Sequence, residues 1–277
     1  MRDELTAAHG AAAPVPAGPS PGRSVLSVHV GDLYGGTTRT FRADTPHRAA
    51  STMKMAVLAA LYRSGADLDR PVPVHNAFAS AAGGTPFGVD RDGDSDPGPW
   101  HALGSERSLR WLAGRMIIHS SNLATNLCLS HVGLEAVAEV WHLAGARHSV
   151  TGRGIDDLDA QALGVVNLVT AADLTRLLCR LPQELLDVLA ANAHRVDLAA
   201  GLPPGTRIAF KNGWFPGVRH SAGIVYPHDA PPYTIAVCYS GPLADGHDIH
   251  DPAARLLARI SAGYWAQRHA IGAEHPH

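Results

Sequence analysis

The sequence predicts an α+β protein, an α/β sandwich built on an antiparallel sheet with an all-helical lobe inserted in the chain. Two observations predict it. Segments rich in β-branched and aromatic residues lie at both ends of the chain, over residues 25–42 and 207–240. Between them, apolar residues recur at helical spacing. Strands at both ends with helices between them indicate one sheet that is divided in the sequence.

Length and charge limit the class of protein. The 277 residues can bury a sizeable core, as one large domain or two interleaved lobes. Lysine and arginine (23) nearly balance aspartate and glutamate (25), so we expect no nucleic-acid partner. No apolar run approaches the ~18 residues that span a bilayer, and the first five residues lack the features of a secretory signal. We therefore expect a cytoplasmic protein with no membrane contact.

Changes in composition predict the boundaries of the leader and of the two lobes. Residues 1–23 consist largely of Ala, Pro and Gly and are predicted to form a flexible leader. Residues 24–51 and 206–277 carry the strands and a closing helix, and are predicted to form the α/β lobe. Residues 52–205 are predicted to form the helical lobe. The active site is then expected at the junction of the two lobes.

Local signals place the individual elements. Gly35-Gly36 separates the strands of an N-terminal hairpin, and Ser108 and Thr170 are expected to cap helices. Further helices are predicted over 134–141, 184–194 and 251–267, and further strands over 207–211, 220–225 and 233–240.

Two groups of polar residues suggest metal sites but lack the required pattern. Aspartates alternate from Asp90 to Asp96, yet the EF-hand glycine and distant glutamate are missing, so a solvated acidic loop within 76–105 is predicted. His247 and His250 lie beside two aspartates in a polar loop without a third well-spaced ligand. The three cysteines are expected to be small buried hydrophobes. We predict no metal and no cofactor.

A serine and a lysine three residues apart open an apolar helix. Ser51 and Lys54 precede a run of Ala, Leu and Met that no Gly or Pro interrupts before Gly65. Their side chains share one face of the first turn, and Ser51 is expected at a capping position. Partial burial favours a neutral lysine, which can activate the serine as a nucleophile. Taken alone, the motif favours a capped helix with a solvated lysine over a nucleophile.

Two further motifs favour the interpretation of Ser51 as a nucleophile. Ser120-Ser121-Asn122 lies among helical segments, and Lys211-Asn212-Gly213 lies on a predicted strand near the C-terminus. With the S-x-x-K pair they follow the order and approximate spacing of the S-D-N and K-T-G motifs of serine β-lactamases and penicillin-binding proteins. Over about residues 24–267 the chain resembles the class A side of that superfamily. The resemblance implies a β-lactamase-like fold with its active site between the lobes.

The resemblance also implies catalytic roles. Ser51 is the acylated nucleophile, Lys54 takes or relays its proton, and Ser120 passes a proton to the leaving group. The backbone amides of Ser51 and Trp214 form the oxyanion hole. Ser121 replaces the usual Asp of the second motif, whose side chain faces away from the substrate in the family.

Substrate-binding positions follow from the same motifs. The amide of Asn122 binds a substrate carbonyl or holds Lys54, and Lys211 attracts a substrate carboxylate. Asn212 replaces the usual Thr or Ser of the third motif, so one hydroxyl contact to a substrate carboxylate is missing. For Trp214, core packing is an equal alternative to lining the pocket. The predicted substrate-binding residues are Asn122, Lys211, Asn212, Gly213, Trp214 and Arg219.

The chain departs from the family in the loop before Asn167. Class A β-lactamases carry there a glutamate that activates the deacylating water, whereas this sequence has no Glu between Glu139 and Glu184. Asp156 is the best substitute and Asp157 the second, although Asp is one methylene shorter. Loop capping, or a salt bridge to Arg153, is an equally good interpretation of either aspartate.

These inferences predict a serine hydrolase that forms a Ser51 acyl-enzyme with a small amide, ester or lactam. We expect this small-molecule substrate to belong to specialised metabolism. A true class A β-lactamase or a D-Ala-D-Ala carboxypeptidase is the first alternative. A non-catalytic ligand-binding protein of the same fold is the second. Neither the oligomeric state nor the identity of the substrate follows from the sequence.

Overall fold

A computed structural model describes residues 23–271 of the chain. The predicted leader, residues 1–23, lies outside the described residues except for its last position. The chain order is a β-hairpin, a set of helices, three strands and a closing helix.

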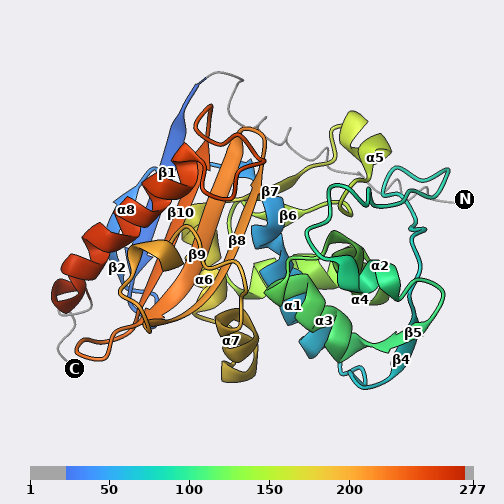
Figure 1. Ribbon diagram of the computed structural model, residues 1–277, viewed down its shortest axis with the longest axis horizontal. Coiled ribbons are helices and arrows are strands. Elements are labelled where there is room, and N and C mark those ends of the chain that lie inside the picture. Colours follow the sequence, from blue (N-terminus) through green and yellow to red (C-terminus); the bar gives the residue numbers. More distant parts are fainter. Residues whose placement is uncertain (1–22, 272–277) are drawn as a thin grey trace, which may run out of the picture.

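Five strands form an antiparallel sheet in the order β2–β1–β10–β9–β8 (Figure 1). The strands are β1 (Val25–Gly31), β2 (Thr37–Phe41), β8 (Arg207–Phe215), β9 (Val218–Tyr226) and β10 (Tyr233–Ser240). Strand β1 pairs with β10, so the N-terminal hairpin completes a sheet that the C-terminal strands begin. The prediction of a divided antiparallel sheet is confirmed.

The helices lie mostly between the two sets of strands. They are α1 (Lys54–Arg63), α2 (Pro97–His101), α3 (Leu109–Ile118), α4 (Asn122–Leu143), α5 (Leu158–Ala162), α6 (Ala171–Leu178), α7 (Gln183–Ala190) and α8 (Pro252–Ala266), with 3₁₀ turns η1 (Ala50–Met53), η2 (Ala199–Gly201) and η3 (Arg268–Ala270). Short strands complete the fold: β3 (His47–Arg48), β4 (Pro71–Pro73), β5 (Glu106–Ser108), β6 (Val150–Thr151) and β7 (Asn167–Val169).

The sheet separates two apolar clusters, because alternate residues of a strand face opposite sides. One face carries large side chains and is covered by α8 (Figure 1). The other face carries small ones, which let helices approach closely, and it joins the core formed by α1, α3, α4, α6 and α7. The large side chains include Ile208, Phe210, Val225, Ile235 and Val237. The small ones are Ala209, Ala222, Ala236 and Cys238, and Ile224 is the larger side chain among them.

Helix ends follow the sequence signals in several places. Ser108 accepts a hydrogen bond from the amide of Trp111 at the start of α3, and Thr170 accepts one from Asp173 at the start of α6, so both predicted caps are confirmed. The predicted helix around 134–141 is the second half of α4, which changes direction at Gly133. At this glycine φ is +81°, a left-handed conformation that glycine adopts at little cost.

Two local predictions need correction. Strand β8 does not end at residue 211 but continues to Phe215, because its full length pairs with β9. The loop over 76–105 is not uniformly solvated and contains α2. Asp96 is buried, caps α2 and pairs with Arg115, while Asp94 accepts five hydrogen bonds. Both carboxylates therefore have folded-state partners, which an alternating acidic pattern does not reveal.

The lobe boundaries at residues 51 and 206 stay a prediction. Helices α6 and α7 belong to the predicted helical lobe by sequence, but α6 packs on β1, β9 and β10, and α7 packs on β8. The helical core is consequently continuous with one face of the sheet.

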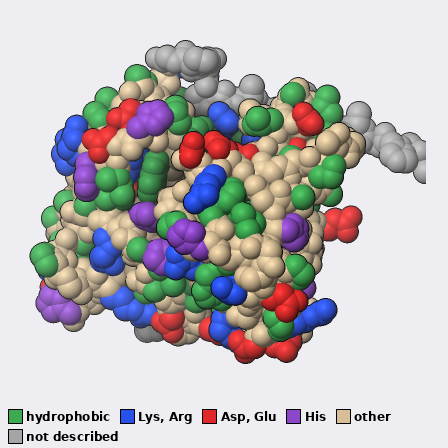
Figure 2. Space-filling model, turned by 45° about the vertical axis from the view of Figure 1, so that its right-hand side comes forward, with side chains coloured by type: hydrophobic (Ala, Val, Ile, Leu, Met, Phe, Trp, Pro, Cys, Tyr) green, Lys and Arg blue, Asp and Glu red, His purple; other side chains and the backbone are tan. Residues whose placement is uncertain are grey.

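The surface shows mixed charge. On the face in Figure 2, basic and acidic side chains are interspersed and do not form a field of one sign. Within residues 23–271, no helix combines the length and apolar character needed to cross a membrane.

Asp173 connects the start of α6 to the segment that leads into β6, which yields a prediction on stability. Its buried carboxylate accepts the backbone amides of Arg147, His148 and Ser149 at 2.8–3.0 Å. Burial acts to raise the pKa of Asp173, but these hydrogen bonds and that of Arg176 outweigh it and lower the pKa. We expect Asp173→Asn to lower the free energy of unfolding by about 2 kcal/mol at neutral pH, measured by urea denaturation.

The sign of the pH dependence follows from the lowered pKa. The charged form stabilises the fold fully above the unfolded-state pKa of about 4, and this contribution is lost as pH falls through the lower folded-state pKa. The difference between wild type and Asp173→Asn therefore narrows below about pH 4. Asp187→Asn, at an exposed ion pair, is the control and changes stability little. A difference that stays constant down to acid pH would contradict this role.

Candidate active site

Ser51 lies where strand β3 passes into the 3₁₀ turn η1 and helix α1. Its hydroxyl does not cap the helix as expected, since the turn has no side-chain cap and its first residue is Ala50. Ala50 has φ of +46°, a left-handed conformation that is unfavourable for alanine. The strained turn ends a short strand immediately before the nucleophile and leaves Ser51 half-buried at the wall of a pocket.

Gly213 brings strand β8 against this turn. A Cβ atom at position 213 would clash with the amide nitrogen of Ser51, and only glycine allows that approach. Gly213 is fully enclosed and binds no substrate through a side chain; its role is to let two backbone segments meet. The predicted oxyanion hole, from the amides of Ser51 and Trp214, would lie at this contact and stays a prediction.

Lys54 is buried one turn after Ser51 and is held by the segment that joins α3 to α4. Its Nζ donates to the carbonyl of Ser120 at 2.6 Å, to Asn122 Oδ1 at 2.9 Å and to the carbonyl of Ser121 at 3.4 Å. Burial lowers the pKa of Lys54 to about 7, although nearby aspartates, Asp94 first among them, act to raise it. A substantial fraction of Lys54 is thus neutral near pH 7 and able to accept a proton.

Two lysines converge on one hydroxyl. Ser120 Oγ lies 2.9 Å from Lys211 Nζ and 3.3 Å from Lys54 Nζ. Burial and the neighbouring Lys54 charge hold the pKa of Lys211 well below its ordinary value. Ser120 itself has φ of +60°, so the turn between α3 and α4 is strained at the residue that both lysines contact. The three motifs meet at this point and give a hydroxyl that can pass a proton.

Asp94 completes the second motif, and sequence reasoning missed it. Its carboxylate accepts the amides of Asn122 and Leu123 at 3.0 Å and the hydroxyl of Ser121 at 3.1 Å. A negative charge at the start of α4 is stabilised by the helix dipole. Because Ser121 stands where the family has Asp, the acid that orders this turn comes instead from the preceding loop.

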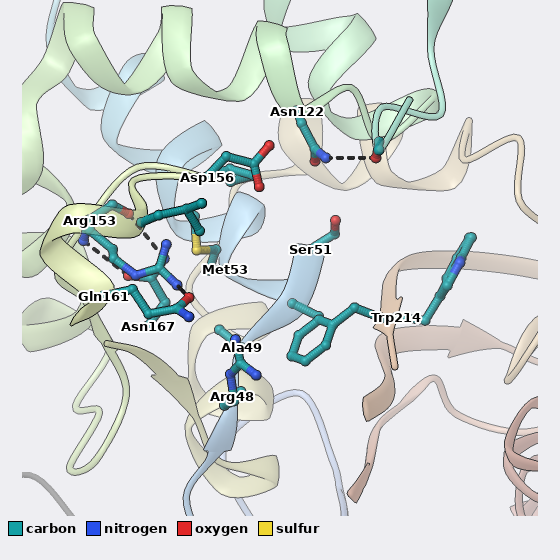
Figure 3. A pocket seen from close by; sticks show the side chains of 15 residues that line it. Arg48, Ala49, Ser51, Met53, Asn122, Arg153, Asp156, Gln161, Asn167 and Trp214 are labelled. Atoms are coloured by element: carbon teal, nitrogen blue, oxygen red, sulfur yellow. Dashed lines mark hydrogen bonds between the residues drawn. The ribbon is translucent and has the colours of Figure 1, made fainter. Parts of the chain in front are cut away.

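A cavity of about 450 Å³ opens beside Ser51 (Figure 3). Its walls come from β3, η1, α4, the loop around α5, β7 and the end of β8. In Figure 3, Ser51 and Asn122 lie on one side and Arg153, Gln161 and Arg48 on the other. The site combines a serine that follows a strained residue, a partly neutral lysine and a cavity of the size of a small-molecule site.

Comparisons with known proteins agree with this geometry. The sequence matches the β-lactamase enzyme family over residues 18–267. The chain belongs to this family. It is a serine hydrolase that acts through an acyl-enzyme, and the prediction of a serine β-lactamase and penicillin-binding protein superfamily member is confirmed.

Similar solved structures share the fold. PBP-A is 20% identical with a TM-score of 0.68, over 88% of this chain and 91% of that chain. L2 complexed with relebactam is 25% identical with a TM-score of 0.68, over 86% and 89%. The class A β-lactamase from Mycobacterium abscessus is 20% identical with a TM-score of 0.68, over 89% and 95%. A search of curated proteins found no match.

The two loop aspartates of this family member have different surroundings. Asp156 lines the cavity with φ of +64°, and its carboxylate accepts the amide of Asp90 at 3.1 Å. Asp157 is buried, caps α5 and accepts hydrogen bonds from Ser80 and Ala81. Of the two, only Asp156 faces the cavity. Arg153 forms no ion pair with either aspartate among the described residues and instead bonds to neutral acceptors.

Asn212 and Arg219 lie behind the cavity wall, which corrects their assignment to substrate binding. Strand alternation turns Lys211 toward Ser120 and Gly213 toward Ser51, and it turns the fully buried Asn212 to the opposite side. Asn212 donates to the carbonyl of His194 and to Asp197. The sequence identified the motif but not the register that separates these side chains.

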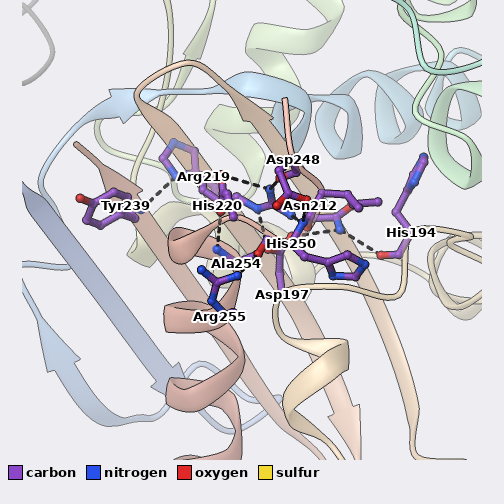
Figure 4. Close-up of polar contacts among 12 residues, drawn as sticks. His194, Asp197, Asn212, Arg219, His220, Tyr239, Asp248, His250, Ala254 and Arg255 are labelled. Atoms are coloured by element: carbon purple, nitrogen blue, oxygen red, sulfur yellow. Dashed lines mark hydrogen bonds and ion pairs between the residues drawn. The ribbon is translucent and has the colours of Figure 1, made fainter. Parts of the chain in front are cut away.

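Arg219 forms a buried charge cluster (Figure 4). Its guanidinium pairs with Asp197 at 2.7 Å and with Asp251 at 3.4 Å, and all three side chains are fully buried. It also lies 4.7 Å from the ring centroid of Trp214, which is opposite it on the neighbouring strand. Arg219 therefore supports the inner side of Trp214, a residue that does line the cavity.

This cluster gives a prediction that separates support from substrate binding. Arg219→Met removes the positive member and leaves two carboxylates buried together, so we expect the free energy of unfolding to fall by about 3–5 kcal/mol. Urea denaturation measures the loss. Arg207→Met is the matched control, because Arg207 pairs with Asp187 at an exposed site and should cost less than about 1 kcal/mol. Equal stability of the two variants would show that Arg219 is not structural.

Proposed function

We propose that the protein transfers the acyl group of a small amide, ester or lactam to Ser51 and then to water. The observation that carries this proposal is the convergence of Lys54 and Lys211 on the Ser120 hydroxyl beside the Ser51 pocket. A binding protein has no need of two buried lysines with lowered pKa values, which are costly to fold.

The proton balance of acylation can be followed through these groups. Neutral Lys54 accepts the Ser51 hydroxyl proton as Oγ bonds to the substrate carbonyl carbon. As the bond to the leaving nitrogen or oxygen breaks, the Ser120 hydroxyl donates a proton to that atom, and Lys54 or Lys211 returns one to Ser120. In its protonated form, Lys211 also stabilises the negative charge of the intermediate.

Deacylation requires a different base. In the proposed reaction, Asp156 activates the water, because its carboxylate is at the cavity wall and raises the pKa of the neighbouring Lys54 through its charge. The shorter side chain and the bond from the Asp90 amide favour slow water activation. We therefore expect an acyl-enzyme that accumulates.

Intact-protein mass spectrometry tests the proposal. A variant of PBP-A forms an acyl-enzyme complex with penicillin G, which makes this compound a suitable first lactam. We expect fluorophosphonate and penicillin G adducts on wild type and none on Ser51→Ala. Asp156→Asn should lengthen the lifetime of the penicillin adduct by about tenfold or more.

The outcomes separate the two steps of the reaction. Absence of both adducts would reject an activated Ser51 and favour a ligand-binding protein. Adduct decay unchanged by Asp156→Asn would reject Asp156 as the base while leaving acylation intact. Rapid decay in the wild type would identify a true β-lactamase activity.

The rate of acylation should depend on pH through Lys54. Burial lowers the pKa of Lys54 to about 7, and the neutral amine is the base, so the acylation rate should rise as pH increases through about 7. Stopped-flow measurement of ester acylation from about pH 5.5 to about pH 8.5 gives the profile. A flat profile would contradict Lys54 as the base.

Asp94→Asn should move this profile in a defined direction. It removes the negative charge that contributes most to raising the pKa of Lys54 and keeps a similar side-chain shape, so the midpoint should shift to lower pH. Asp69→Asn, on an exposed surface pair with Arg110, is the control and should leave the midpoint in place. A shift to higher pH in Asp94→Asn would refute the electrostatic coupling.

A further inference from the structure

Two guanidinium groups face the cavity from the side away from Asn122 (Figure 3). Arg48 comes from β3, and Arg153 comes from the loop before α5. Gln161 and Asn167 line the same end and add polar groups. Neither arginine belongs to the three motifs, and sequence analysis did not assign either of them to substrate binding.

The contacts of both arginines leave their charge without an acidic partner. Arg153 donates to the carbonyls of Val165 and Gly154 at 3.1 Å and to Gln161 at 2.5 Å, all neutral acceptors. The guanidinium carbon of Arg48 lies 4.5 Å from the ring centroid of Phe215. Within residues 23–271, no carboxylate is within ion-pair distance of either group.

The charge of Arg48 acts on Arg153. Burial lowers the pKa of Arg153 and the charge of Arg48 lowers it further, whereas the charges of Asp157 and Asp156 act to raise it. Like charges at one end of a cavity repel, and a bound anion would relieve the repulsion. Guanidinium groups bind carboxylates through paired, charge-assisted hydrogen bonds. Asp156, the acid at this cavity, lies toward Met53 and Asn122 in Figure 3.

The position of the cavity decides which part of the substrate would reach the arginines. Ser120 and Lys211, which deliver the proton to the leaving group, are not among the residues that line it. The leaving group therefore departs on the other side of Ser51. The part of the substrate that stays bonded to Ser51, the acyl group, extends into the cavity.

We propose that Arg48 and Arg153 form an acyl-side subsite for a carboxylate. The inference rests on the proposed function and narrows its substrates to amides or esters of a dicarboxylic acid, or lactams that carry a carboxylate on the acyl side. The free carboxylate lies between the two guanidiniums. Phe215 and Gln161 hold the arginines in place.

A pair of esters that differ only at the distal group tests the subsite. The probes are p-nitrophenyl hydrogen adipate and p-nitrophenyl adipamate, which place a carboxylate or a neutral primary amide at the same distance from the reacting carbonyl. The burst of p-nitrophenolate gives the acylation rate, after subtraction of the release measured with Ser51→Ala. We expect the wild type to prefer the adipate by about tenfold, as for one charge-assisted hydrogen-bonded pair.

Variants at Arg48 test whether this residue causes the preference for the adipate ester. Arg48→Gln should reduce the adipate preference toward equality, whereas Arg48→Lys should retain part of it because the charge remains. Arg153 is left unchanged, since its hydrogen bonds to backbone carbonyls hold the loop. Arg207→Gln, at a remote surface, is the control for a change of net charge and should keep the full preference.

The possible outcomes are distinct. Equal Ser51-dependent rates for the two esters in the wild type would overturn the subsite and leave the proposed function standing. A preference that survives in Arg48→Gln would overturn the role of Arg48. Release that is the same in wild type and Ser51→Ala for both esters would overturn the proposed function, and the subsite with it.

Discussion

The site depends on the hydrogen bonds that Lys54 donates to the Ser120–Asn122 segment. A buried ammonium is costly unless hydrogen bonds replace its hydration, and here three backbone or amide oxygens do so. These bonds join α1 to the turn between α3 and α4. The hydroxyl of Ser120 then extends the connection to Lys211 on β8. A single network therefore ties the helices to the sheet at the serine.

Strand alternation decides what this network meets on the sheet. In β8, Lys211 bonds to Ser120 and Gly213 contacts the turn that carries Ser51, while Asn212 faces the buried cluster around Arg219 and Asp197. The cluster supports Trp214 from behind, and Trp214 forms part of the cavity wall. A three-residue motif thus serves two environments, one catalytic and one structural.

The second motif shows how a substitution within a family is balanced elsewhere. Ser121 lacks the carboxylate usual at its position, and Asp94 from a loop 27 residues earlier bonds to its hydroxyl. The same carboxylate bonds to the backbone of Asn122, which in turn holds Lys54. The charge of Asp94 thereby influences the basicity of the lysine as well as the start of α4.

The divided sheet, the helices between its halves and the three motifs could be predicted from the sequence, because periodicity, caps and short-range spacing are local properties. The sequence could not assign Asp94, Arg48 or Arg153, because their roles arise from segments distant in the chain. Tertiary structure alone decided that Arg219 and Asn212 lie behind the wall and that Asp156, not Asp157, faces the cavity. The left-handed backbone at Ala50 and Ser120 is likewise imposed by packing, since neither residue favours it.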